Sequence, residues 1–333
     1  MLTALEGVWK YRGMQGARKE AVMKVVIGDE AVGQRLDNYL FRHLKGVPKS
    51  RIYRMLRGGE ARVNGRRAEP SQRLAAGDEV RIPPVRTAQP ASIPPVRVTR
   101  SLLERVIYRD AGLLAVDKPA GQAVHGGSGV SLGIIEQLRL ELPGLPFMEL
   151  VHRLDKETSG VLLVALKRSA LTAMHRMLRE GQVHKTYTTL ARGQWQGGKR
   201  HVRLPLHKYV TDEGERRVVV NDAGQDAHTI FRLVTQYPGF SLLEAELKTG
   251  RTHQIRVHLA ALGHPIAGDD KYGDFELNRH LKKRGLRRMF LHARRLAFAH
   301  PLTGEPLVLE SPLPEDLQQF LHEMERAGGC TTL

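Results

Sequence analysis

The stretch Val151–Ala165 constrains this chain most, because a charged segment runs directly into a short apolar one. Val161–Ala165 follows Gly160 and has the length of a buried strand. The charged half carries five ionisable residues in close succession: His152, Arg153, Asp155, Lys156 and Glu157. A charged loop held by a rigid strand is a common position for a functional site.

Asp155 is the residue of interest in this loop, since Arg153 and Lys156 stand on either side of it. Nearby cations favour the ionised form of a carboxylate. An ionised, well-positioned carboxylate can act as a nucleophile. A structural salt bridge produces the same pattern, so the residues alone leave both interpretations open.

Composition indicates a multidomain protein that faces a polyanion. A chain of 333 residues is long for a single core. It holds 52 Lys and Arg against 35 Asp and Glu, a net charge of +17 spread along its length, which favours nucleic acid as the partner. No stretch has the pattern of a membrane-spanning or membrane-surface helix, and no signal peptide is expected. The single cysteine, Cys330, excludes internal disulfides and a thiolate metal site, so we expect a cytoplasmic protein without a bound metal.

Residues 1–22 show no periodicity and are expected to form a disordered extension. Residues 23–83 predict a small domain that begins with a strand near Met23. Leu36, Leu40 and Leu44 give one helical face, and Ser50 fits the N-cap of a second helix. The pair Asn64-Gly65 predicts a hairpin, and 79–82 a last strand.

Residues 32–82 of this domain are strongly basic, with twelve Lys and Arg residues against five acids. Arg51, Arg54 and Arg57 fall on one side of the second helix, where phosphate binding is favoured over a merely solvated face. The order from Arg35-Leu36-Asp37 through Val63-Asn64-Gly65 to Gly77-Asp78 resembles the S4 RNA-binding domain.

Five prolines between 83 and 95 predict a semi-rigid linker over 84–100. Residues 101–333 then mix strands and helices, which predicts an α+β catalytic domain with a mixed sheet. Strands are expected at 106–109, 113–117, 161–165, 185–190, 202–206, 217–220, 229–235, 242–247 and 291–300. Helices are expected at 132–142, 169–180 and 314–327.

A second concentrated stretch covers 248–273. Thr252 fits the N-cap of a helix whose apolar face is Ile255, Leu259 and Leu262. Arg251, His253 and Arg256 are expected in its first turns, where cations and the helix N-terminus attract an anion such as phosphate or Asp155.

Together these motifs resemble the pseudouridine synthases of the ribosomal large-subunit type, with an S4 domain ahead of the catalytic domain. The resemblance rests on 152–160 (His-Arg-Leu-Asp-x-x-Thr-Ser-Gly), 185–187 (Lys-Thr-Tyr), 250–258 (Gly-Arg-Thr-His-Gln-Ile-Arg-Val-His) and 116–121 (Val-Asp-Lys-Pro-Ala-Gly). Residues 45–50 and 124–129 point to one particular member. The resemblance implies that specific uridines of 23S ribosomal RNA are isomerised without a cofactor.

The same resemblance implies Asp155 as the nucleophile, Tyr187 against the target base and Arg256 as the partner of Asp155. Lys118, His125, Arg153, Arg251 and His253 are candidate RNA contacts. The residues do not decide between attack at C1′ and removal of a 2′ proton. Two other functions stay open, an RNA N-glycosidase and a non-catalytic RNA-binding or assembly factor. A monomer is expected.

Overall fold

The computed structural model describes residues 22–44, 47–85, 100–126, 132–212, 214–328 and 331–332. The expected disordered extension, nearly all of the Pro-rich linker and residues 127–129 of the Gly-rich loop lie outside them. The chain forms two compact units, Met1–Pro94 and Pro95–Leu333. The finer boundaries expected from the sequence stay predictions.

The first unit is a small α/β layer with its own core. Strands β1 (Met23–Val26), β4 (Glu79–Ile82), β2 (Arg62–Val63) and β3 (Arg66–Arg67) form an antiparallel sheet in that order. Helices α1 (Leu36–His43) and α2 (Lys49–Arg57) supply Leu36, Leu40 and Ile52 to the core. The predicted cap is wrong: α2 is capped at Pro48, two residues before Ser50, and the Pro48 carbonyl accepts from the amide of Arg51 at 2.9 Å.

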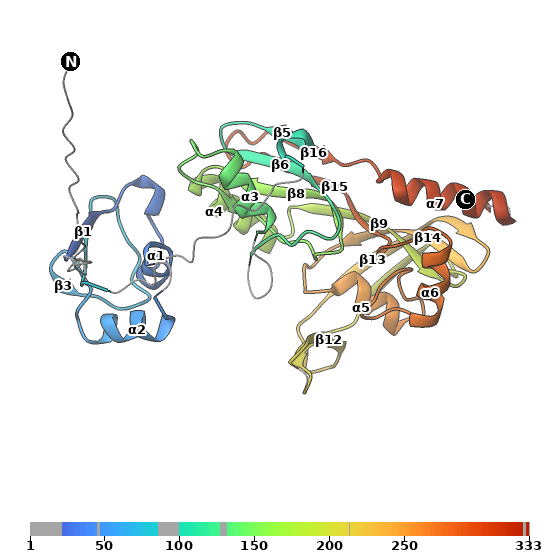
Figure 1. Ribbon diagram of the computed structural model, residues 1–333, viewed down its shortest axis with the longest axis horizontal. Helices are drawn as coiled ribbons and strands as arrows, with labels where there is room; N and C mark the ends of the chain where they lie inside the picture. The colour runs from blue at the N-terminus through green and yellow to red at the C-terminus, as the bar shows by residue number, and fades with distance from the viewer. Residues whose placement is uncertain are drawn as a thin grey trace, which may run out of the picture. The chain divides into compact units, whose positions relative to one another are not determined.

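The second unit is built on one large mixed sheet (Figure 1). Its main path runs β10 (Lys199–Arg203), β13 (His228–Tyr237), β14 (Phe240–Leu247), β9 (His184–Arg192), β15 (Leu291–Ala299), β8 (Ser159–Ala165), β6 (Leu113–Lys118) and β5 (Val106–Arg109). Short strands β7 (Glu149–Leu150), β16 (Pro306–Glu310) and β17 (Thr331–Thr332) pair with β8, β15 and β13. The β15–β8 pair is parallel and the other paired strands are antiparallel.

Helices cover both faces of this sheet, so its central strands are buried on both sides. Alternate residues of β8 enter two cores: Leu162 and Val164 pack with α3 (Ile134–Glu141) and α5 (Gln254–Ala261), while Leu163 packs with α4 (Arg168–Arg179). Helices α6 (Phe275–Lys283) and α7 (Glu315–Gly328) add a third core. This double burial explains why Val161–Ala165 is continuously apolar instead of alternating.

A separate two-stranded hairpin, β11 (Leu206–Val210) and β12 (Arg216–Val220), projects beside α5 (Figure 1). A single strand over 202–206 was expected, but Pro205 separates β10 from β11 because proline cannot donate to a strand ladder. Helix α6 and strands β7, β16 and β17 were not expected.

Candidate functional site

The candidate site is organised around the loop 151–158, which enters β8. The amide of Val151 donates to the carbonyl of Leu163 at 2.9 Å, and Nε2 of His152 accepts from the amide of Leu163 at 3.2 Å. Burial, with the charge of Lys185, lowers the pKa of His152 to about 4, so its ring is neutral and able to accept. The start of the loop is thereby tied to the middle of the strand that follows it.

The other end of the loop depends on Gly160, whose φ of 110° disfavours any other residue. A Cβ at this position would lie 2.2 Å from the carbonyl oxygen of Ala293 in the parallel strand β15. The close contact of β8 and β15 therefore fixes where the loop ends.

Asp155 and Arg256 meet across 101 positions of sequence. Nη1 of Arg256 donates to Oδ2 of Asp155 at 3.1 Å. On its other side the same guanidinium binds Asp269 in bidentate fashion, with Nε to Oδ2 at 2.7 Å and Nη2 to Oδ1 at 2.8 Å. Asp155 is 28% exposed, whereas the Asp269 side chain is 1% exposed. Arg256 is thus fixed by an interior carboxylate and presents its remaining edge to a partly open one.

Asp155, Arg256 and Asp269 form a triad in which opposite charges stabilise one another. Burial lowers the pKa of Arg256, but the hydrogen bond and charge of Asp269, with the charge of Asp155, raise it above its ordinary value. Burial raises the pKa of Asp269, and the hydrogen bond and charge of Arg256 outweigh that effect and lower it. Two carboxylates and one guanidinium carry a net negative charge, and Asp155 is the member of the triad that a second ligand can reach.

Tyr187 lies in β9 on the face of the sheet that α5 covers, and its residue is 7% exposed. Burial, followed by the charge of Asp155, raises the pKa of its phenol. The phenol therefore keeps its proton at neutral pH and offers a donor and a flat ring beside the carboxylate.

His253 belongs to the site, but the local backbone differs from the expectation. The cap of α5 is His253 itself, with a left-handed φ of 54°, and not Thr252. Its Nδ1 lies 2.8 Å from the hydroxyl of Tyr272, and its Nε2 lies 3.9 Å from Oδ2 of Asp155. Burial lowers the pKa of His253, with the charge of Asp155 acting in the opposite direction.

Lys118 was expected to contact RNA, and this prediction is wrong. Its side chain is completely buried, and Nζ donates to the carbonyls of Pro119, Lys156 and Thr158 at 2.8, 2.9 and 2.8 Å. Burial lowers the pKa of Lys118 to about 7, but three acceptors are satisfied together only by the ammonium form. Lys118 therefore holds the loop of Asp155 in place through hydrogen bonds from the protein interior.

The other candidate RNA contacts differ in solvent exposure and in the hydrogen bonds that they already make. Arg153 and His125 are exposed, and Arg251 is exposed while its Nε donates to the carbonyl of Asp226 at 3.0 Å. In the first unit, Arg54 and Arg57 are exposed. Arg51 forms a bidentate pair with Glu60 at 3.1 and 2.9 Å.

The sequence did not reveal Asp269 and Tyr272, which both support Arg256. The guanidinium lies 5.0 Å from the ring centroid of Tyr272, and the hydroxyl of Tyr272 accepts from the amide of Val218 at 3.0 Å. The run Gly268–Gly273 could have indicated them, because it places an acid and an aromatic residue shortly after the helix that carries Arg256.

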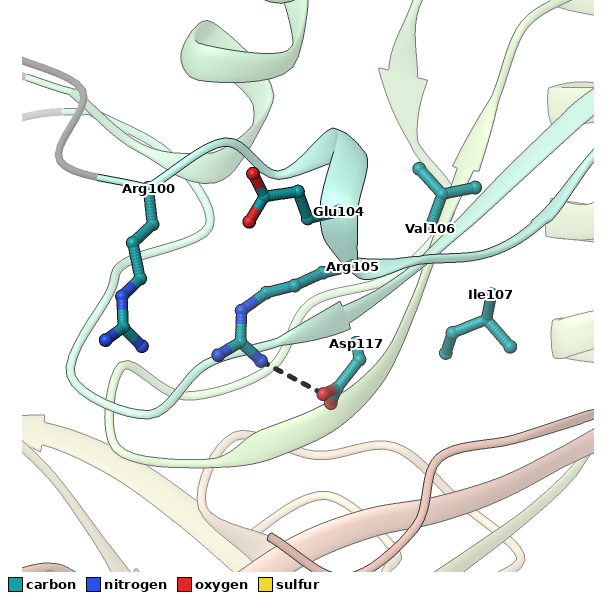
Figure 2. A pocket seen from close by; sticks show the side chains of 6 residues that line it. All are labelled: Arg100, Glu104, Arg105, Val106, Ile107 and Asp117. Carbon is teal, nitrogen blue, oxygen red and sulfur yellow. Dashed lines mark hydrogen bonds and ion pairs between the residues drawn. The ribbon is translucent and has the colours of Figure 1, made fainter.

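Two cavities lie next to this site, and Asp155 lines neither. The first, about 440 Å³, is lined by Arg100, Glu104, Arg105, Val106, Ile107 and Asp117. Figure 2 shows the ion pair of Arg105 with Asp117 across it, at 3.1 Å. The second, about 740 Å³, extends from Asp117 to Glu157, two residues after Asp155, and to Arg287. Only the second cavity includes a residue of the loop 151–158, and neither contains the carboxylate of Asp155.

Within the described ranges, no three His, Cys, Asp or Glu side chains are grouped so that they could hold a metal ion. No helix among those residues is long and apolar enough to cross a membrane. The site offers a partly exposed carboxylate, a protonated phenol and a guanidinium fixed by Asp269.

Comparison with known proteins gives consistent results. Residues 112–261 match the model of the RNA pseudouridylate synthase family, and residues 34–80 match that of the S4 domain. The chain is 49% identical to ribosomal large subunit pseudouridine synthase C of Escherichia coli K12, covering 92% of this chain and 98% of the relative. It is 48% identical to the protein of the same name from Pasteurella multocida, covering 91% and 94%. Human RNA pseudouridylate synthase domain containing 4 has a similar solved structure, with a TM-score of 0.56 and 29% identity over 67% of this chain and 94% of that one.

Proposed function

The chain belongs to the RNA pseudouridylate synthase family, whose members are isomerases, and from that premise we propose that it converts specific uridines of large-subunit 23S ribosomal RNA to pseudouridine. The printed names of its relatives support this substrate, and the S4-like unit supports an RNA partner. One observation supports the chemistry most: Arg256 is locked on Asp269 and presents a partly exposed Asp155.

Asp155 acts as the nucleophile toward ribose in this proposal. The reaction breaks the bond between C1′ and N1, turns the base, forms a bond between C1′ and C5, and moves the C5 proton away while N1 regains one. Atoms and electrons balance without a redox step or a co-reactant, so no cofactor is required. A carboxylate can begin the reaction at C1′ or by removing the 2′ proton, and both routes need it ionised and fixed.

Arg256 maintains that state, because a guanidinium held at 3.1 Å favours the charged carboxylate. Tyr187 holds the detached uracil against its ring. In this proposal its phenol, protonated at neutral pH, relays the proton that leaves C5 by giving up its own proton as it accepts that one.

The reacting ribose of a stacked or paired nucleotide is shielded, so the target uridine must leave its stack to meet Asp155. The exposed side chains of Arg153, His125 and Arg251 are proposed to hold the displaced strand. Arg54 and Arg57 of the first unit are proposed to bind phosphates elsewhere in the same RNA. We further propose that the protein works as a cytoplasmic monomer.

Asp155→Asn tests the proposal, with Glu157→Gln as the matched control two residues away. Both replacements remove one negative charge at nearly constant volume. On a large-subunit ribosomal RNA transcript, Asp155→Asn should abolish pseudouridine formation and keep RNA binding within about threefold. Glu157→Gln should remain active.

Two other outcomes identify the alternatives. A glycosidase uses two carboxylates, so release of free uracil by the parent protein and loss of that release in both variants would indicate an RNA N-glycosidase. RNA binding by all three proteins without any chemical change in the RNA would indicate a binding or assembly factor. Pseudouridine formation by Asp155→Asn would exclude Asp155 as the nucleophile.

A further inference from the structure

A cluster of exposed cations covers α6 and the turn after it. We call it the α6 cationic surface; it consists of the exposed residues Arg279, Lys282, Lys283, Arg284 and Arg287, with the exposed side chain of His280 among them. The opposite face of α6 carries Leu277 and Leu281, which pack into the core. The helix is therefore amphipathic, with its polar side almost entirely cationic.

Few acids neutralise this surface. Arg279 lies 3.4 Å from Glu276, an exposed pair one turn away. In the described part of the chain, no ion pair joins an acid to Lys282, Lys283, Arg284 or Arg287. From the elements packed against this surface, Glu323 of α7 lies opposite Gly285, and Glu157, Glu315 and Asp316 line the cavity that Arg287 also lines. Lys282, Lys283 and Arg284 thus face solvent without forming an ion pair with any acid of the described ranges, and Arg287 faces acids only across a cavity.

The helix that carries these cations is fixed to the site. Asn278 accepts from the amide of Gly268 at 2.8 Å and donates to the carbonyl of Asp269 at 2.9 Å. At the start of α6, Asp274 caps the amide of Leu277 at 3.0 Å. Helix α6 is therefore hydrogen-bonded directly to Asp269, the residue that fixes Arg256.

The far end of the surface reaches the loop of Asp155. Nη2 of Arg288 donates to Oγ of Ser159 at 2.7 Å, at the point where that loop enters β8. Arg287 and Glu157 line the same cavity of about 740 Å³. The cations accordingly extend from α6 to a cavity beside the loop that carries Asp155.

We infer that the α6 cationic surface binds the phosphates of the RNA that flanks the target uridine. This inference rests on the proposed function for the identity of the polyanion. A membrane surface is disfavoured because Leu277 and Leu281 are packed inside, and Phe275 is the single large apolar side chain that α6 exposes, which is too little for an apolar face. Lys and Arg side chains at a duplex or single strand release condensed counterions, so binding at this surface is strongly salt dependent.

The test is the triple variant Lys283→Gln/Arg284→Gln/Arg287→Gln. Its control is Lys167→Gln/Arg176→Gln/Arg179→Gln, which removes three exposed cations at and within α4 of the same unit. Binding to a full-length large-subunit ribosomal RNA transcript is measured from 50 to 300 mM salt, together with single-turnover pseudouridine formation and thermal unfolding.

The α6 variant should bind at least about tenfold more weakly at 0.1 M salt. Its slope of log affinity against log salt should fall by about 2 to 3, because each lost contact contributes about 0.7 to 0.9. The control should keep the parent slope within about one, and both variants should unfold as the parent does, because all six side chains are exposed.

An unchanged slope in the α6 variant, or an equal loss in both variants, overturns the inference. These results are separable from the proposed function. A parent protein that binds RNA through this surface but forms no pseudouridine refutes the function alone. A parent that forms pseudouridine, with an α6 variant of unchanged affinity and slope, refutes the surface alone.

Discussion

Replacing Asp269 by Asn should both destabilise the second unit and slow catalysis, although Asp269 does not reach the substrate. The side chain is 1% exposed and supplies two of the three hydrogen bonds that connect Arg256 to carboxylates. Its Oδ1 also accepts from the amides of Lys271 and Tyr272, at 2.8 and 3.0 Å. An amide at this position places an NH2 donor where a carboxylate oxygen faced the guanidinium, and, among the described residues, it leaves Asp155 as the one carboxylate bound to this buried cation.

The size of the effect follows from burial. Removing one partner of a buried ion pair costs about 3 to 5 kcal/mol. In a domain of this size each kcal/mol lowers Tm by roughly 2 to 4 °C, so a loss of roughly 6 to 20 °C is expected. Asp155 is partly exposed and makes one contact to the same guanidinium, so Asp155→Asn should cost about 1 kcal/mol or less.

Asp155→Asn should reduce the catalytic rate more than Asp269→Asn does, although it costs less stability. Asp155→Asn abolishes the reaction, whereas Asp269→Asn only frees the guanidinium to move. A displacement of about 1 Å in a positioned group costs about 10²-fold in rate, and we expect a loss of that order.

The assay combines thermal unfolding with single-turnover pseudouridine formation, and Asp270→Asn is the control. Asp270 is the next residue, is exposed, and loses the same charge. It should unfold within about 2 °C of the parent at the parent rate. A Tm for Asp269→Asn equal to that of Asp270→Asn would refute the view that Asp269 holds Arg256.

Three further predictions concern groups outside this triad. Lys118→Met removes the donor from three carbonyls and leaves an interior site without its ammonium, so it should lower the free energy of unfolding by about 3 kcal/mol, seen as a lower urea midpoint. Burial lowers the pKa of His152 to about 4, so its contribution to stability is complete above about pH 6.5 and is lost as pH falls through 4. Urea unfolding of His152→Asn should therefore depend less on pH between 4 and 6.5 than that of the parent, and an equal dependence would exclude this role. In the first unit, Arg54→Gln/Arg57→Gln should lower the salt slope of RNA binding by about 1 to 2, while Arg51→Gln should act mainly on stability through Glu60.

The parts of the fold that sequence predicts well are those with one dominant physical cause. Residues Val161–Ala165 are apolar because they enter cores on both faces of the sheet, so the strand was evident. The hairpin at Asn64-Gly65 was evident because both residues adopt positive φ, at 50° and 75°. Helix α6 was missed because its polar face is almost entirely charged and only Leu277 and Leu281 mark its buried side.

In the site, the sequence predicted the residues that belong to motifs but missed the buried residues that support them. Asp155, Tyr187 and Arg256 were picked out by motif, and the structure brings Arg256 to Asp155 and places Tyr187 within reach of its charge. Lys118 was misjudged because a lysine side chain is normally solvated, and two of its three carbonyl acceptors, those of Lys156 and Thr158, come from a distant segment. Asp269 was overlooked for the same reason, since pairing of buried charges depends on tertiary contacts and not on local pattern.

The parallel pairing of β8 with β15 has a consequence for biosynthesis. Ser159 is bound by Arg288 and His292, and His292 in turn contacts Ser311. A ribosome therefore makes Asp155 long before it makes the residues that fix its loop. The first unit, with a core of its own, can fold and engage RNA while the rest is still being translated. A nascent chain should then acquire RNA affinity early and activity only in a late step, after β15 has left the exit tunnel.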